Sequence, residues 1–201
     1  HIQGANHIAL TDPNFVAAVK RLADNTNKAI VFYCNGITCS KSYRAVETMQ
    51  ANGFRDSIAY DGGAFSWSRN YPQYTILMGN RLTDSKQSLI DDETFKSHLL
   101  QPADFISQVG DKTLVLDLRD LFKTDAIRLF PGIEHRISLD EKRKIDYYLN
   151  QAKKEGKTLI AYDEVGKQVR WFQYHLEEAG VDNYYFMAGG IKNYLDHVLN
   201  Y

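Results

Sequence analysis

The only two cysteines of the 201-residue chain lie five residues apart in the segment IVFYCNGITCSKS, residues 30–42. Cys34 directly follows an apolar run that is typical of a strand, and a helix-like stretch begins near Lys41. A cysteine at a strand end ahead of a helix faces unpaired backbone N–H groups and the positive end of the helix dipole. Such a position lowers the pKa of a thiol from about 8.5 to about 3.5–7.5, so the segment predicts a reactive thiolate.

The rest of this loop has the composition of an anion site. Backbone N–H groups that point into a loop form a nest for an anion, and glycine gives the loop conformational freedom. Two serine hydroxyls can donate hydrogen bonds or cap the helix, and a lysine adds positive charge. With Cys34 as the candidate nucleophile, the candidate binding residues are Asn35, Gly36, Ile37, Thr38, Cys39, Ser40, Lys41 and Ser42.

Each cysteine has a second interpretation. Cys34 on its own is also compatible with a buried core cysteine, since free cysteines are mostly buried. Cys39 is either a resolving thiol, which forms a disulfide with Cys34 or receives sulfur from it, or a loop cysteine without a redox role. Geometry decides between these, because a bridge requires Cα atoms within about 7 Å.

The chain contains an internal repeat. An apolar run, a polar loop, a helix-like stretch and a glycine occur at residues 29–54 and again at 158–181, and each copy is followed by an apolar run and a Gly-Gly pair. From Cys34 to the second glycine of its pair is 29 residues. From Asp163, which takes the place of the cysteine, to the matching glycine is 27 residues. We assign the two-residue difference to the loop after Cys34.

Periodicity predicts the elements of each repeat. Apolar residues at helical spacing indicate helices over 41–51 and 168–178, and the apolar run 113–118 indicates a strand covered on both faces. Alternating strands and helices predict an α/β fold with two domains, each a small, mainly parallel sheet flanked by helices. Ligands of such sheets bind at the carboxyl ends of strands, which is where Cys34 is expected.

The domain boundaries follow from composition. We expect a first domain over residues 1–80 that carries the candidate cysteine, and a second over 103–201 that lacks it. The polar segment 81–102 between them is expected to be a linker with a connecting helix.

Bulk properties argue against several classes of partner. The net charge is −1, with acidic and basic residues mixed along the chain, so neither a nucleic-acid surface nor a polybasic membrane patch is indicated. No apolar run approaches the 18 or so residues of a membrane span. The 6 histidines have no ligand spacing, so we expect no metal, and no motif indicates a cofactor.

Six segments, in their order and spacing, resemble a tandem of two rhodanese-like domains. Residues 62–72 are similar to the closing G-G-x-x-x-W-x-x-x-x-P segment of that family, and 114–120 to its opening strand with D-x-R. The six segments are HIQGANHI (1–8), IVFYC (30–34), GGAFSWSRNYP (62–72), LVLDLRD (114–120), PGIEHRI (131–137) and AGGIKNY (188–194).

The resemblance implies a thiosulfate sulfurtransferase of the rhodanese type. Cys34 would take a sulfane sulfur from a small anionic donor such as thiosulfate, hold it as a persulfide, and pass it to cyanide, a thiol or a protein. Asp163 would prevent a persulfide in the second domain, which would then be a scaffold or docking surface. Asp117 and Arg119 would form a structural ion pair near this second site. The first domain would lack its own opening helix and D-x-R strand, which makes it incomplete at its N-terminal end.

Other functions stay open at this point. The chain could be a non-catalytic sulfur carrier, sensor or protein-interaction module. A thiol–disulfide redox protein is less favoured, because C-x4-C departs from the usual C-x-x-C. A phosphatase is also less favoured, because Ser40 stands where a C-x5-R loop has its arginine. The loop also resembles that of some exported bacterial rhodanese-like proteins, so the compartment is open between cytoplasm and periplasm.

Overall fold

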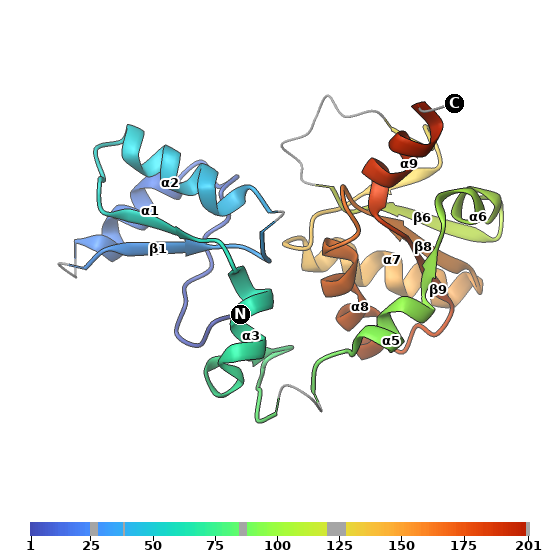
Figure 1. The fold of residues 1–201 in the computed structure, drawn as a ribbon, viewed down its shortest axis with the longest axis horizontal. Coiled ribbons are helices and arrows are strands. Elements are labelled where there is room, and N and C mark those ends of the chain that lie inside the picture. Colours follow the sequence, from blue (N-terminus) through green and yellow to red (C-terminus); the bar gives the residue numbers. More distant parts are fainter. Residues whose placement is uncertain (25–27, 38, 85–87, 120–127, 200–201) are drawn as a thin grey trace. The chain divides into compact units, whose positions relative to one another are not determined.

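The computed structural model describes residues 1–24, 28–37, 39–84, 88–119 and 128–199 of the chain. The chain forms two compact units, unit 1 (His1–Leu89) and unit 2 (Ile90–Tyr201). Figure 1 shows that each unit has its own strands and helices. None of the helices in the described part of the chain combines the length and the apolar character that crossing a bilayer requires.

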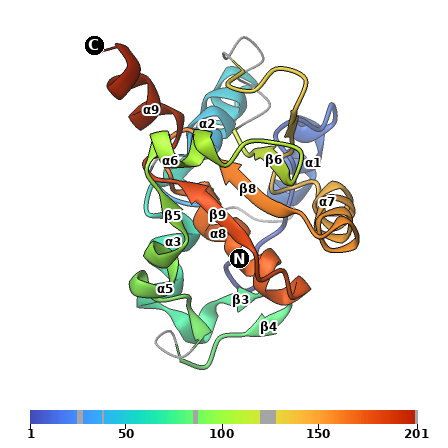
Figure 2. The same ribbon diagram turned by 90° about the vertical axis from the view of Figure 1, so that its right-hand side faces the viewer.

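Unit 2 is built on a five-stranded sheet whose strand order is β5-β9-β8-β6-β7. All four neighbouring pairs are parallel, and Figure 2 shows β5, β9, β8 and β6 side by side. The strands are β5 (Leu99–Leu100), β6 (Thr113–Asp117), β7 (Glu134–Arg136), β8 (Thr158–Tyr162) and β9 (Tyr184–Met187). The predicted α/β fold with a mainly parallel sheet is confirmed.

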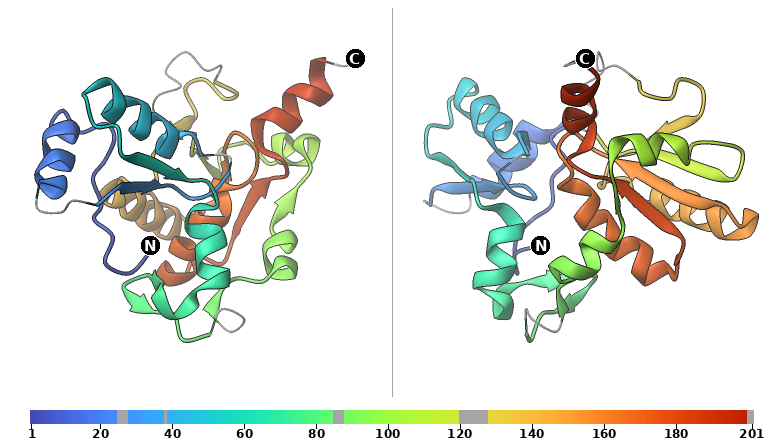
Figure 3. Two further views of the ribbon diagram at one scale, coloured as in Figure 1. Left: turned by 60° about the vertical axis from the view of Figure 1, so that its left-hand side comes forward. Right: turned by 45° about the vertical axis from the view of Figure 1, so that its right-hand side comes forward.

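Helices cover both faces of this sheet (Figure 3). Alternate residues of a strand point to opposite faces, so Leu114 and Leu116 pack with α5, α7 and α8, whereas Val115 packs with α6 and α9. The near-continuous apolar runs of β6 and β8 are therefore buried on both sides. The helices are α5 (Asp92–Ser97), α6 (Pro102–Ser107), α7 (Lys142–Glu155), α8 (Gln168–Ala179) and α9 (Gly190–Leu199).

Unit 1 is smaller and has a two-stranded parallel sheet, β1 paired with β2. Phe15 and Val19 of α1 and Met49 of α2 pack on one face of it, together with Ile30 and Phe32. A short antiparallel pair, β3 with β4, completes the described strands of this unit. Its elements are α1 (Phe15–Ala23), β1 (Ile30–Tyr33), α2 (Lys41–Ala51), β2 (Ser57–Tyr60), α3 (Gly63–Asn70), η1 (Pro72–Tyr74), β3 (Ile76–Leu77) and β4 (Asn80–Arg81).

The segment expected to be a linker, 81–102, contributes to unit 2. It contains α5, which is capped by the Asp91 carboxylate accepting from the Thr94 N–H at 2.7 Å. It also contains β5, which pairs with β9 and so becomes the edge strand of the larger sheet. A connecting helix was expected here, but the strand was not, because a run of two leucines is too short to have a period.

Candidate functional site

Cys34 directly follows β1, and the loop after it leads into the N-terminus of α2. Cys34 and Cys39 are joined by a disulfide, and their Cα atoms lie 6.1 Å apart. Cys34 is half-buried, whereas the Cys39 side chain is 4% exposed. The loop is further closed by the Cys39 N–H, which donates to the Gly36 carbonyl at 2.8 Å. Of the two interpretations of Cys39, the disulfide favours the resolving thiol.

The turn at Gly62 and Gly63 is packed directly on the start of this loop. Ala64 N–H donates to the Cys34 carbonyl at 2.8 Å, and Phe65 N–H donates to the Asn35 carbonyl at 3.0 Å. Gly63 has a φ of +54°, and a Cβ there would lie 2.4 Å from the Cys34 carbonyl oxygen. Only glycine suits such a position, so the Gly-Gly pair fixes where Cys34 lies.

The other predicted site residues occupy different environments. The Ile37 side chain is 68% exposed, Ser42 is buried, and Thr38 lies outside the described residues. Ser40 is the N-cap residue of α2, but its hydroxyl makes no capping hydrogen bond to the described part of the helix, so the predicted serine cap is wrong there. Lys41 is the first residue of α2, which places its charge at the end of the loop.

The corresponding loop of unit 2 begins at Asp163, directly after β8. The Asp163 carboxylate accepts hydrogen bonds from the backbone N–H groups of Val165 at 2.8 Å and Val169 at 3.0 Å, and from those of Gly166 and Gln168. Its side chain is fully buried, so the interpretation of this segment as a solvated turn is wrong. Burial raises the pKa of Asp163, although the four N–H donors favour its charged form.

The backbone around Asp163 repeats the contacts around Cys34. Ile191 N–H donates to the Asp163 carbonyl at 2.8 Å, and Lys192 N–H donates to the Glu164 carbonyl at 3.0 Å. Gly190 has a φ of +64°, and a Cβ there would lie 2.5 Å from the Asp163 carbonyl oxygen. Because α2 begins seven residues after Cys34 and α8 begins five after Asp163, the extra two residues do lie in the loop of unit 1.

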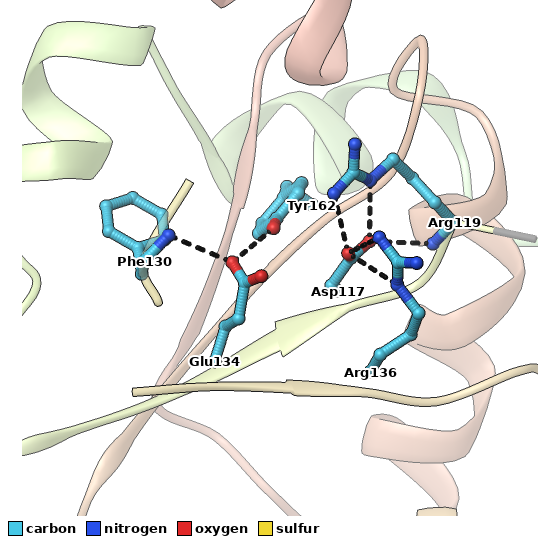
Figure 4. Close-up of polar contacts among 6 residues, drawn as sticks. All are labelled: Asp117, Arg119, Phe130, Glu134, Arg136 and Tyr162. Carbon is cyan, nitrogen blue, oxygen red and sulfur yellow. Dashed lines mark hydrogen bonds and ion pairs between the residues drawn. The ribbon is translucent and has the colours of Figure 1, made fainter. Parts of the chain in front are cut away.

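A buried ion cluster lies at the carboxyl ends of β6 and β7 (Figure 4). The Asp117 carboxylate accepts from Arg119 Nε at 2.9 Å and Nη2 at 2.8 Å, which confirms the predicted ion pair. Arg136 donates to the same carboxylate through Nε at 2.9 Å and Nη2 at 2.8 Å. Burial alone would raise the pKa of Asp117, but Arg119, together with Arg136, outweighs it and holds the pKa below its ordinary value of 3.8.

A second buried carboxylate lies on the neighbouring strand β7. Glu134 accepts from the Tyr162 hydroxyl at 2.5 Å and from the Phe130 N–H at 3.0 Å. Burial and then the hydrogen bond to Glu134 raise the pKa of Tyr162, so this hydroxyl stays protonated and acts as a donor. Sequence reasoning missed this pair and Arg136. The signal was the alternation of residues 134–136 in the weakly matching segment after Pro131.

No group of three or more histidine, cysteine, aspartate or glutamate side chains with metal-site geometry occurs among the residues that the structure describes. The acidic groups of unit 2 are instead held by arginine, tyrosine and backbone N–H donors. The described site chemistry is therefore that of two thiols in unit 1 and of a buried carboxylate in unit 2.

Residues 1–70, which include the whole Cys34 loop and the Gly-Gly turn, match the family of rhodanese-like domains. This part of the chain is a rhodanese-like domain. The predicted resemblance is thereby confirmed for the first repeat, and the match does not extend over the second. Cys34 of the rhodanese-like domain lies at the strand end where the resemblance placed the sulfur-carrying cysteine.

Curated relatives of the chain carry the name tRNA uridine(34) hydroxylase. The protein of Burkholderia cenocepacia strain J2315 is 29% identical over 109 residues, which are 54% of this chain and 37% of that protein. The protein of Burkholderia mallei strain NCTC 10229 is 28% identical over 109 residues, which are 54% of this chain and 36% of that protein. The match thus spans little more than a third of the length of these relatives.

A solved structure described as a probable thiosulfate sulfurtransferase is also similar. It is 16% identical, and the match covers 98% of this chain and 89% of that chain with a TM-score of 0.37. The TM-score is too low to relate the two structures in detail.

Proposed function

We propose that the protein is a sulfurtransferase that carries a sulfane sulfur on Cys34. The observation that supports this is the position of Cys34: it follows β1, precedes the N-terminus of α2, and lies in a rhodanese-like domain. This position offers a thiolate the free N–H groups and the dipole of the first helical turn. Donor and acceptor are proposed by class only, as a small anionic sulfur donor and a thiophilic acceptor.

The reaction begins from the reduced loop, because a cysteine in a disulfide is not a nucleophile. The Cys34 thiolate attacks the sulfane sulfur of thiosulfate. The S–S bond of thiosulfate breaks, and sulfite leaves with the electron pair. The outer sulfur of the resulting persulfide is then attacked by cyanide or a thiolate, and the Cys34 thiolate leaves. No metal or cofactor takes part in either step.

The loop of unit 2 supports the anion-binding part of this proposal. There, four backbone N–H groups after a strand end converge on the Asp163 carboxylate. The loop after Cys34 leaves the same kind of strand and is held by the same Gly-Gly contacts. We infer that unit 2 is a second rhodanese-like domain that binds its own carboxylate in place of a persulfide, so the chain has one sulfur-carrying site.

Intact mass measurement tests the proposal. The protein is reduced, freed of reductant and incubated with thiosulfate. We expect the release of sulfite in an amount equal to the protein, which shows that Cys34 has taken the sulfane sulfur. Cys34→Ser should release no sulfite and gain no mass. If the wild-type protein also releases no sulfite, the chain is a non-catalytic sulfur carrier, sensor or interaction module, and the proposal is overturned.

A second candidate function is modification of tRNA. The observation that favours it is the 28–29% identity to proteins named tRNA uridine(34) hydroxylase. The net charge of −1 gives little electrostatic attraction to a polyanion, although a local basic surface could still bind one. Expression of the chain in cells that lack such a hydroxylase, followed by nucleoside analysis of tRNA, tests it: restored hydroxylation at uridine 34 would support this candidate, and unchanged tRNA would exclude it for this chain.

A further inference from the structure

The disulfide places two thiols, rather than one, in the sulfur-carrying loop. Cys39 Sγ is bonded to Cys34 Sγ, which is the inner sulfur of a Cys34 persulfide. Cys39 is 4% exposed and directly precedes the N-cap residue of α2. A thiol ahead of a helix N-terminus is favoured as the thiolate, so Cys39 is suited to act as a second nucleophile.

We propose that Cys39 resolves the persulfide and releases its outer sulfur as hydrosulfide. The Cys39 thiolate attacks Sγ of Cys34, a new S–S bond forms between the two cysteines, and the bond from Cys34 Sγ to the outer sulfur breaks. The outer sulfur leaves with the electron pair as HS⁻. The two thiols are oxidised to a disulfide, and the sulfane sulfur is reduced to sulfide. The sum is thiosulfate and two thiols to sulfite, hydrogen sulfide and the disulfide.

Three properties of the loop favour attack on the inner sulfur. The bond in the structure joins Cys39 to Sγ of Cys34, so the loop can bring these two atoms together without rearranging its ends. Holding the nucleophile in the same loop makes the step intramolecular, which can correspond to an effective concentration on the order of 10⁵ M or more. Hydrosulfide is also a better leaving group than an alkyl thiolate, because the better leaving group is the weaker base.

Burial of Cys39 separates this route from ordinary thiol acceptors. A side chain that is 4% exposed is poorly accessible to thiols from solution, whereas the half-buried Cys34 remains accessible to the donor. The structure then corresponds to the end of one cycle, with the disulfide formed. Further turnover needs a dithiol reductant, which reduces the disulfide by exchange and is itself oxidised to a disulfide.

A single-turnover experiment without reductant or acceptor tests this inference, which rests on the proposed function. Reduced full-length protein is mixed with thiosulfate without oxygen, and sulfite, sulfide and intact mass are measured. For the wild type we expect one sulfite and one sulfide per chain, and a final mass that is two hydrogens below the reduced protein. Dilution of the protein should not lower the sulfide yield, because the step is intramolecular.

Two variants at Cys39 separate the outcomes. Cys39→Ser and Cys39→Ala should release sulfite, gain the mass of one sulfur that cyanide removes, and lose sulfide release. That gain also shows that the variants are folded. A wild-type protein that keeps the added sulfur, on either cysteine, and releases no sulfide overturns the inference while the proposed function stands. If neither the wild type nor the Cys39 variants release sulfite, the proposed function itself fails, and this inference fails with it.

Discussion

The loops that follow β1 and β8 begin alike and end differently. In both, a glycine with positive φ packs on the carbonyl of the first loop residue, and the next two N–H groups of the following helix hold the loop backbone. In unit 2 the first residue is Asp163, and its carboxylate takes up four loop N–H groups. In unit 1 it is Cys34, bonded to Cys39, and the loop is two residues longer.

This difference teaches how one backbone design serves two purposes. A carboxylate supplied by the chain satisfies the loop of unit 2 permanently, which suits a structural role and leaves no room for an external anion. The longer loop of unit 1 contains two thiols, which can be oxidised, reduced or loaded with sulfur. The four predictions below test the parts of this comparison, and each uses a matched change in the other unit or at a neutral position.

The shared part of the two loops is the close approach of the glycine, and its loss should have the largest effect. Gly63→Ala and Gly190→Ala would place a Cβ 2.4 Å and 2.5 Å from a backbone oxygen, at a φ that L side chains rarely adopt. We expect each to cost more than about 4 kcal/mol in the free energy of unfolding of its own unit. Urea unfolding followed by tryptophan fluorescence measures this, with Trp67 reporting on unit 1 and Trp171 on unit 2 in single-tryptophan proteins.

Gly53→Ala and Gly132→Ala are the matched controls for the glycine pair. Both glycines have a φ of +84°, but a Cβ at either position would meet no atom within 4 Å. These variants should therefore cost only the left-handed backbone penalty, about 1–2 kcal/mol. Equal costs for Gly63→Ala and Gly53→Ala would contradict the close packing of the turn on the Cys34 loop.

The part that differs is the anion, and removing it from unit 2 should have the next largest effect. Asp163→Ala leaves four inward N–H groups without their acceptor, so we expect a loss of about 3–5 kcal/mol in the stability of unit 2. Formate, a small carboxylate, should restore part of it, and this rescue is measured by urea unfolding with and without the anion. Asp182→Ala, which removes an exposed acid of the same unit, is the control. Sulfur loading at Cys34 should survive in both variants, and loss of loading in Asp163→Ala alone would show that the two sites depend on each other.

Much of this comparison could be predicted from local sequence patterns. Helical periodicity predicted a helix over 41–51, and the observed helix has these bounds. The strand over 113–118 and the helix over 168–178 each agree with the structure to within one residue. The two-residue difference between the loops was also predicted correctly, because the distances to two later glycines changed together.

The remaining features depend on contacts between segments that are distant in sequence. Arg136 reaches Asp117 because the parallel register of β6 and β7 sets these residues opposite each other, 19 positions apart. β5 is a strand only because β9 pairs with it. The burial of Asp163 was missed for a different reason: a polar loop sequence does not indicate whether its N–H groups point outward to water or inward to a side chain.

The ion cluster of unit 2 predicts a smaller, pH-dependent effect. Asp117→Asn removes the charge that two buried guanidinium groups share, so we expect a loss of about 3 kcal/mol at neutral pH. Because the folded-state pKa of Asp117 lies below 3.8, its stabilisation is present above pH 3.8 and is lost as the pH falls through the lower folded value. The difference in unfolding free energy between wild type and variant should therefore shrink in acid. A difference that stays constant with pH down to the acid unfolding of the wild type would contradict a charged Asp117.

The smallest predicted effect concerns the charge at the start of α2 in unit 1. Lys41→Ala should slow sulfur loading from thiosulfate about two- to fivefold, which corresponds to the roughly 0.3–1 kcal/mol that a partly exposed charge contributes near a helix end. Lys28→Ala is the matched control, since Lys28 is exposed and precedes the amino end of β1, at the opposite end of the strand from Cys34. Because salt screens such an interaction, the difference between the two variants should vanish at high ionic strength. An equal loss in both variants would mean that thiosulfate responds to the charge of the whole unit, and the loop after Cys34 would then bind its anion through backbone N–H groups alone, as the loop after Asp163 does.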